Sequence, residues 1–280
     1  MKSRAWSKAI GKKLHFLWEA LKKFDDDNGF FLSSGITFNL LICFVPLLLL
    51  LLALVGTYLS SDREVLSHLN RYIESAIPSL DPRIMESILR IIHDREIVGG
   101  LGIGGLAWTS TWVFSSLRTA LNAVFQVEKR RGILRGKAID LLMVFLAGLF
   151  LWVSMLVTSS ITFLQGYRVS SFVDMGALFR YVLKYLLPFF FTYWMAFFIY
   201  KIIPNRKIGV GIALKAALFT SFLWEAAKQF FGWYVLHLGR FSILYGSLST
   251  LAIFFFWIYY SSSILLLGGE IAFLLEKGKK

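Results

Sequence analysis

The sequence predicts an all-α membrane protein, a polytopic bundle of six transmembrane helices that forms a single membrane domain over residues 1–280. Hydrophobic residues make up 57% of the chain and the mean hydropathy is +0.65, which is more apolar surface than a soluble domain of this length needs. Several uncharged runs exceed the ~20 residues that cross a bilayer. The basic residues cluster in short segments between these runs, so the net charge of +13 indicates membrane orientation and not nucleic-acid binding.

Residues 1–24 are predicted to form an amphipathic helix at the membrane surface. Apolar residues recur every three or four positions while lysines occupy the other faces; the apolar stripe is Trp6, Ile10, Leu14, Leu17, Leu21 and Phe24. Such a helix lies along an anionic membrane surface and does not cross it. A docking interface for a partner is the alternative. The following Asp25-Asp-Asp-Asn28-Gly29 predicts a helix cap and a break.

Six apolar runs predict the transmembrane helices: residues 30–61, 97–127, 141–165, 185–203, 208–236 and 241–275. The polar residues 62–95 carry apolar positions at helical spacing on both sides of two prolines, which predicts an extracytoplasmic helical hairpin. Eighteen basic residues then face the cytoplasm and nine face outside, so both termini are predicted to be cytoplasmic. In the second run, Gly100 and Gly104 predict close approach of a neighbouring helix.

Arg118 is the only charged residue between Ile97 and Val127. An unpaired guanidinium within a bilayer costs at least ~2.5 kcal/mol, so Arg118 is expected to have partners. Ser115 and Asn122 lie three and four residues away, which puts them on the same helix face and indicates that this face points into protein. The alternative is that the arginine stem extends to the interface as an anchor, although the basic residues after this span already fill that role.

Four polar residues from different spans are predicted to lie at one depth, in the inner-leaflet half of the membrane: Asn39, Arg118, Lys215 and Glu270. Together with Asn122 they predict a substrate-binding cavity that opens toward the cytoplasm or the inner leaflet. Arg118 and Lys215 would hold a phosphate or carboxylate, and Glu270 would orient Arg118 or carry a proton.

Two further charges, Glu225 and Lys228, lie three residues apart in the fifth predicted span. This spacing predicts an ion pair within one helix, buried near mid-membrane. Such a pair can fix helix register without taking part in chemistry, and that purely structural role stays open beside a functional one.

An enzyme is not expected. The four histidines, His15, His68, His93 and His237, are far apart and predicted on different sides of the membrane, so they do not form the ligand cluster of a metal hydrolase. Cys43 is the only cysteine and lies in an apolar span, which excludes a disulfide framework and a cysteine-based metal site. We therefore expect no catalytic residues, no metal, no cofactor and no nucleic-acid partner.

Three segments of the chain carry motifs in a fixed order: Ile36-Thr-Phe-Asn39 through Phe44-Val-Pro46, Leu117-Arg118-Thr-Ala-Leu121-Asn122, and Tyr245-Gly246-Ser247 through Trp257-Ile-Tyr259 to Leu267-Gly-Gly-Glu270. In these motifs and their order, the chain resembles the YihY/BrkB family of bacterial inner-membrane proteins. The usual Ala-Tyr of the family's first span is replaced here by Gly35-Ile36-Thr-Phe38. The resemblance implies a six-helix inner-membrane protein linked to envelope function. The family's former label, ribonuclease BN, has no support in the histidine pattern.

Two functions fit these observations. One is a transporter or flippase that moves an anionic amphiphile, a lipid or an envelope precursor, with membrane lipids as its partners. The other is a membrane scaffold that organises envelope machinery without transport. A polar cavity joining the predicted site residues would favour transport, whereas a dry core with locally paired charges would favour a scaffold. No internal repeat is evident, so the inverted-repeat architecture of many transporters has no support.

Overall fold

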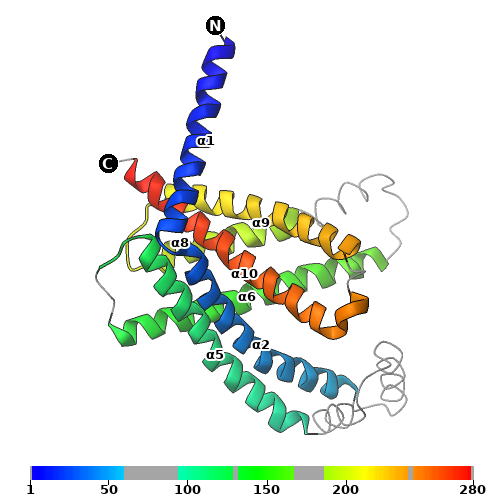
Figure 1. Cartoon of the computed structure of the whole chain (residues 1–280). Coiled ribbons are helices and arrows are strands. Elements are labelled where there is room, and N and C mark those ends of the chain that lie inside the picture. Colours follow the sequence, from blue (N-terminus) through cyan, green and yellow to red (C-terminus); the bar gives the residue numbers. More distant parts are fainter. Residues whose placement is uncertain (1, 60–93, 129–131, 167–185, 239–241, 279–280) are drawn as a thin grey trace. The chain divides into compact units, whose positions relative to one another are not determined.

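The computed structural model describes residues 2–59, 94–128, 132–166, 186–238 and 242–278. These residues form seven helices and no strand, which confirms the all-helical fold class (Figure 1). The helices are α1 (Lys2–Asp26), α2 (Gly29–Leu59), α5 (Arg95–Val124), α6 (Ile133–Gly166), α8 (Leu187–Ile202), α9 (Val210–Leu238) and α10 (Ser242–Lys277). The predicted extracytoplasmic hairpin, residues 62–95, falls almost wholly outside the described residues.

Five helices are long and apolar enough to span a membrane: α2, α5, α6, α9 and α10. The predicted fourth span corresponds to α8, which is apolar but has 16 residues. At the helical rise this is about 24 Å, less than the ~30 Å hydrocarbon core. Whether α8 is a further membrane span, which would bring the total to six, stays a prediction. The cytoplasmic location of both termini also stays a prediction. The predicted third span, 141–165, corresponds to α6, which begins earlier at Ile133 because Arg135, Lys137 and Asp140 end the apolar run without ending the helix.

The chain divides into two compact units. Unit 1 comprises Met1–Thr37 and Phe114–Lys280, and unit 2 comprises Phe38–Val113. In unit 2, glycines of α5 lie against α2: a Cβ at Gly102 would lie 3.0 Å from the backbone nitrogen of Leu50, and one at Gly105 would lie 3.1 Å from Cβ of Pro46. The prediction that Gly100 and Gly104 make this approach is wrong, because both face open space.

The core of unit 1 is the packing of α9 against α8 and α10 (Figure 1). Alanines allow this approach: Ala213, Ala216 and Ala217 on α9 are fully buried. Beside them, the hydroxyl of Tyr200 lies 2.7 Å from Thr220 Oγ1 and donates to the carbonyl oxygen of Leu265 at 2.7 Å. One hydroxyl thus joins α8, α9 and α10, which satisfies polar groups that a bilayer cannot solvate.

Between α1 and α2 the chain turns sharply at Asn28, whose φ of 56° ends the first helix. Asparagine tolerates this left-handed conformation. Gly29 follows beneath the ring of Phe24, and a Cβ there would lie 2.5 Å from ring carbons. The predicted break at Asp25–Gly29 is therefore present, because α1 ends at Asp26 and α2 begins at Gly29.

Four chain segments meet at one end of unit 1, which we call the charged end. The end of α5 contacts the end of α10, with the rings of Phe125 and Phe273 6.5 Å apart. Arg206, after α8, donates to the carbonyl oxygen of Phe125 at 3.2 Å and lies 3.3 Å from the carboxylate of Glu276. Lys23 of α1 donates to the carbonyl oxygen of Val124 at 2.9 Å. These are the segments that the charge pattern assigns to the cytoplasm.

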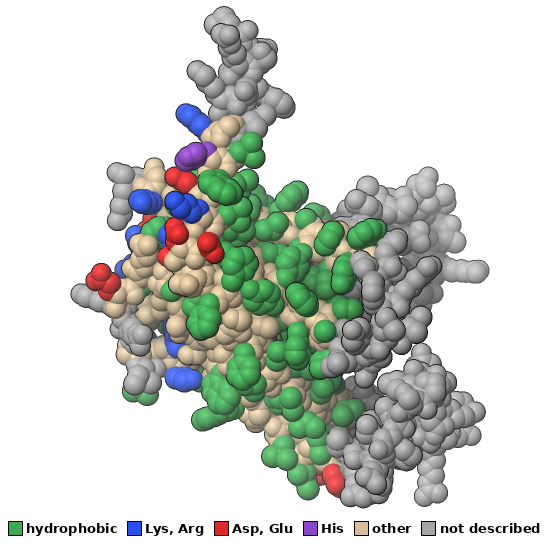
Figure 2. Space-filling model, viewed as in Figure 1, with side chains coloured by type: hydrophobic (Ala, Val, Ile, Leu, Met, Phe, Trp, Pro, Cys, Tyr) green, Lys and Arg blue, Asp and Glu red, His purple; other side chains and the backbone are tan. Residues whose placement is uncertain are grey.

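Outside this end, the helices present apolar side chains to their surroundings. Phe145 and Leu151 of α6, Phe222 of α9 and Phe256 of α10 are all at least two-thirds exposed. Figure 2 shows hydrophobic side chains spread over the helical body, with most of the charged ones gathered near the base of α1. Lipid chains are the natural cover for such a surface.

Candidate functional site

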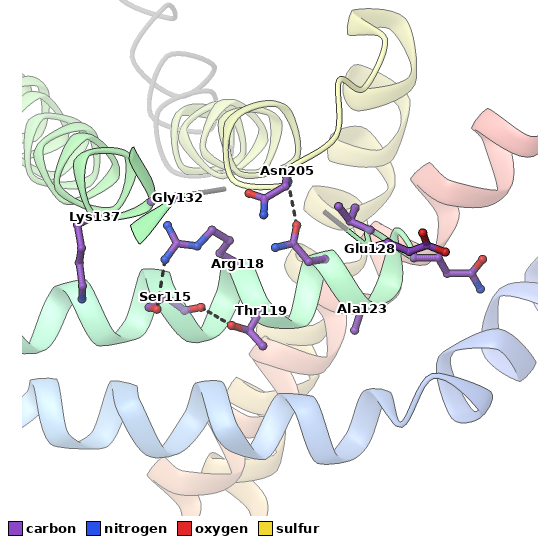
Figure 3. A pocket seen from close by; sticks show the side chains of 12 residues that line it. Ser115, Arg118, Thr119, Ala123, Glu128, Gly132, Lys137 and Asn205 are labelled. Carbon is purple, nitrogen blue, oxygen red and sulfur yellow. Dashed lines mark hydrogen bonds between the residues drawn. The ribbon is translucent and has the colours of Figure 1, made fainter. Parts of the chain in front are cut away.

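A cavity of about 660 Å³ lies at the charged end of unit 1, and we call it the Arg118 cavity. One face of α5 supplies Ser115, Arg118, Thr119 and Asn122 at helical spacing. The connection to α6, the first turn of α6 and the connection between α8 and α9 complete the wall with Gln126, Glu128, Gly136, Lys137 and Asn205 (Figure 3). Most of the side chains in the cavity wall are therefore polar. They come from the end of α5, from the start of α6 with the connection before it, and from the connection between α8 and α9.

Arg118 enters this cavity paired with Asp140 of α6. Its Nη1 lies 2.9 Å from Oδ1, and its Nη2 donates to Oδ2 at 3.0 Å. Nη2 also lies 3.3 Å from the hydroxyl of Ser115 (Figure 3). The arginine side chain is 15% exposed and the aspartate side chain 2% exposed. A guanidinium carries five N–H donors, so this pairing leaves donors of Arg118 without a partner among the described residues.

Gly136 makes room for the guanidinium. A Cβ at this position would lie 2.8 Å from Nη1 of Arg118, too close for any side chain without a shift of the arginine. Nη1 is buried and, within the residues described, makes no well-aligned hydrogen bond in spite of its contact with Oδ1. The first two turns of α6 thus supply the counter-charge through Asp140 and the space through Gly136.

Asn122 holds the far wall of the cavity in place. Its Oδ1 accepts a hydrogen bond of 2.8 Å from the backbone N–H of Asn205 (Figure 3). Asn205 Oδ1 is buried and accepts no hydrogen bond from the described part of the chain. Asn122 therefore lines the cavity, and its amide oxygen is bound to the α8–α9 connection. Its role as a ligand-binding residue stays a prediction.

Glu270 does not face Arg118. Its side chain is fully buried and its Oε2 lies 2.6 Å from Nζ of Lys23 on α1. Lys23 also pairs with Asp27, donates to the Val124 carbonyl oxygen, and lies 4.2 Å from the ring centre of Phe273. We call this arrangement the Lys23 junction. The prediction that Glu270 orients Arg118 is wrong, because Asp140 pairs with Arg118 and Glu270 pairs with Lys23. The alternative, that Glu270 carries a proton, stays a prediction.

Lys215 is also separate from Arg118. It lines a different cavity of about 490 Å³ between α1, α9 and α10, and the two cavities share no lining residue. The predicted joint grip of Arg118 and Lys215 on one anion is therefore wrong. Asn39 belongs to unit 2, so it is not placed with the other four predicted residues.

Glu225 and Lys228 form the ion pair that their spacing predicts, with 2.6 Å between Nζ and Oε2. The pair is not buried, however, because its side chains are 22% and 38% exposed. Gln229 adds a hydrogen bond of 3.0 Å from its Nε2 to Glu225 Oε1. Because Glu225 and Lys228 neutralise each other within α9, neither charge needs a partner on another helix.

Two residues of these clusters are not identified from the sequence. The predicted boundaries put Asp140 just outside the third span, although it is the only carboxylate near the start of that span. The amphipathic pattern assigns Lys23 to the lysines on the polar faces of a surface helix. An apolar run shows which charged residue within it needs a partner. It does not show which residue on another helix is that partner. Within the described residues, no three His, Cys, Asp or Glu side chains are grouped closely enough to hold a metal ion.

The comparisons with known proteins agree on one family. The family model described as Virulence factor BrkB matches residues 20–280. A UPF0761 membrane protein of Rhodospirillum centenum is 27% identical over 269 residues, covering 96% of this chain and 58% of the relative. One of Chlorobium phaeobacteroides is 28% identical, covering 93% and 56%, and one of Haemophilus influenzae is 24% identical, covering 91% and 93%. No solved structure matches the chain.

The chain thus spans less than two thirds of the length of the first two of these relatives. All three are named as membrane proteins, in agreement with the five long apolar helices. The family match covers every residue of the Arg118 cavity and of the Lys23 junction. It confirms the resemblance drawn from the sequence: the chain belongs to the BrkB virulence factor family of membrane proteins.

Proposed function

We propose that the protein moves an anionic amphiphile, a lipid or an envelope precursor, across the bacterial inner membrane, and that the Arg118 cavity binds its anionic group. The observation that carries this proposal is a cavity of about 660 Å³, lined by polar side chains, at the end of helices whose outer surfaces are apolar. A polar space of this size beside the bilayer suits a ligand with a charged head and an apolar tail.

The chemistry of the lining supports an anion. Arg118 presents a planar guanidinium, which matches the oxygens of a phosphate or carboxylate. Lys137 adds a second cation, and the side-chain amide of Asn122 adds a hydrogen-bond donor. In the chain between α5 and α6 the sequence carries Lys129, Arg130 and Arg131. Asp140 serves as the counter-ion of Arg118 until an anionic ligand shares the guanidinium.

A scaffold without transport is the second candidate, and a specific observation favours it. Among the described residues, four basic side chains within or beside the spans have a carboxylate partner: Arg118 with Asp140, Lys23 with Glu270, Lys228 with Glu225, and Arg206 with Glu276. Such local pairing stabilises a membrane fold without requiring a ligand. The two functions therefore differ at Arg118. In a transporter the guanidinium also binds the anionic ligand, whereas in a scaffold it stays paired with Asp140 alone.

Reconstituted vesicles test the proposal. The intact chain is reconstituted with fluorescent phosphatidylglycerol in both leaflets, and dithionite bleaching of the outer leaflet reports the exchange rate. We expect wild-type protein to accelerate exchange over protein-free vesicles. Arg118→Ala should lower the protein-dependent rate at least about tenfold, since it removes charge-assisted hydrogen bonds to the anion. With wild-type protein, fluorescent phosphatidylcholine should exchange more slowly than fluorescent phosphatidylglycerol, because it carries no net negative charge.

Matched variants separate binding from folding. Arg118→Lys keeps the charge and loses the planar fork, so its rate should fall between wild type and Arg118→Ala. Lys207→Gln removes an exposed cation that lines none of the described cavities and should leave the rate unchanged. If folded wild-type protein gives the protein-free rate for both lipids, transport of these amphiphiles is contradicted and the scaffold is favoured.

A further inference from the structure

Two cavities lie where α1 crosses α9 and α10, and Phe16 lines both. The Lys215 cavity, about 490 Å³, is lined by Phe16, Glu19, Ile212, Lys215, Leu274 and Lys277 among others. The Phe219 cavity, about 370 Å³, is lined by Lys12, Phe16, Leu17, Phe219 and Ile271. Neither shares a residue with the Arg118 cavity.

The Lys215 cavity has an excess of positive charge. Lys215 and Lys277 make no ion pair with any residue in the described ranges. The one carboxylate in the wall is Glu19, which lies 3.9 Å from His15 on the outer side of α1. Two ammonium groups facing one carboxylate attract a further anion, and compact ammonium groups are suited to phosphate.

The Phe219 cavity is apolar except for Lys12. On α9, Phe219 lies one helical turn, about 6 Å, further from the charged end than Lys215. On α10, Ile271 lies in the same direction from Leu274 and Lys277. Both helices therefore place the cationic wall at the charged end and the apolar wall one turn deeper. This order matches an amphiphile whose anionic head lies at the membrane surface and whose chain points inward.

We propose that α1, α9 and α10 form a binding site for an anionic phospholipid, separate from the Arg118 cavity. The phosphate lies between Lys215 and Lys277, and an acyl chain lies along Phe219 and Ile271 beneath Phe16 of α1. The bound lipid thereby fills the space between α1 and the bundle and contributes to the attachment of α1. The site does not depend on transport through the Arg118 cavity.

Lipid titration of thermal unfolding tests the site. The intact chain in a neutral detergent is titrated with dioleoyl phosphatidylglycerol, and the concentration that gives half of the rise in Tm is measured. Wild-type protein should respond at lower concentrations of phosphatidylglycerol than of phosphatidylcholine. K215Q and K277Q should each raise the half-effect concentration about fivefold, since each lysine contributes about that factor near an anionic lipid. Both substitutions are on exposed side chains, so the variants should fold.

Three further arms make the test specific. K22Q, an exposed lysine of α1 that lines neither cavity, should leave the response unchanged. E19Q should lower the half-effect concentration, because it removes the competing carboxylate. Inorganic phosphate alone should raise Tm much less than the lipid, because it does not fill the Phe219 cavity.

Three results would overturn the proposal. They are equal responses to phosphatidylglycerol and phosphatidylcholine, a phosphate response as large as the lipid response, and a K215Q/K277Q response equal to that of K22Q. None of these results bears on whether the Arg118 cavity transports its ligand.

Discussion

The Arg118 cavity and the Lys23 junction hold two buried ion pairs that are closely matched in exposure and different in surroundings. The cations, Arg118 and Lys23, are 15% and 13% exposed, and the carboxylates, Asp140 and Glu270, are 2% and 0% exposed. Lys23 donates to Glu270, Asp27 and the Val124 carbonyl oxygen, which uses the three protons of an ammonium group. Arg118 has two partners and lines an open cavity.

This difference separates a structural joint from a candidate binding group. At the Lys23 junction the ammonium group uses its three donors and Phe273 covers it, so Lys23 has no donor left for an anionic ligand. In the Arg118 cavity the guanidinium retains donors and faces polar space. Equal burial of two charges therefore says little about their roles, whereas the number of satisfied donors and the presence of a cavity distinguish them.

Removal of Lys23 should have the largest effect. Lys23→Met leaves Glu270 buried without its cation, which costs about 3 kcal/mol in free energy of unfolding. Lys22→Met, at the exposed neighbouring position, is the control and should change stability by less than about 0.5 kcal/mol. Denaturant titration of the detergent-solubilised variants measures both. A loss for Lys23→Met no larger than that of its control would refute the assignment of the junction as a structural joint.

Asp140→Asn should have an intermediate and salt-dependent effect. It removes the counter-charge of Arg118, but the guanidinium can then bind water or an anion in the cavity, so the expected cost is about 1–2 kcal/mol. Added sulfate should recover part of this loss by binding the folded state. Glu270→Gln should show no such recovery, since the Lys23 junction has no open cavity. Thermal unfolding with and without sulfate measures this contrast, and equal recovery in both variants would contradict it.

Gly136→Ala should have the smallest effect on stability. Alanine favours the helix by about 1 kcal/mol over glycine, but its Cβ would lie 2.8 Å from Nη1 of Arg118. The end of a long side chain can shift, so we expect a net change within about 1 kcal/mol. The displaced guanidinium should nevertheless bind sulfate less well than in the wild-type protein. The same sulfate titration measures this, and an unchanged response would show that Gly136 does not position Arg118.

Much of the fold is predictable from the sequence, because the apolar runs and the basic segments between them are local features. The break at Asn28 and the helical class follow from composition and turn chemistry alone. The pairing of the buried charges does not. The sequence identifies Arg118 as a charge that needs partners, yet its carboxylate is on α6, and the carboxylate of Glu270 is held by α1. Such pairs depend on which helices meet, and no periodicity within one helix encodes that.

The central claim is that the Arg118 cavity is accessible to water and binds an anionic amphiphile, and cysteine labelling tests it most directly. Cys43 is the only cysteine, so Cys43→Ser provides a background without thiols. In that background Thr119→Cys, at an exposed position in the cavity wall, should react with a charged maleimide. Phe222→Cys, on an apolar outer surface, should react poorly in vesicles. Short-chain phosphatidylglycerol should slow the labelling at Thr119→Cys, and short-chain phosphatidylcholine should not. Failure of Thr119→Cys to label, or equal protection by both lipids, would contradict the account.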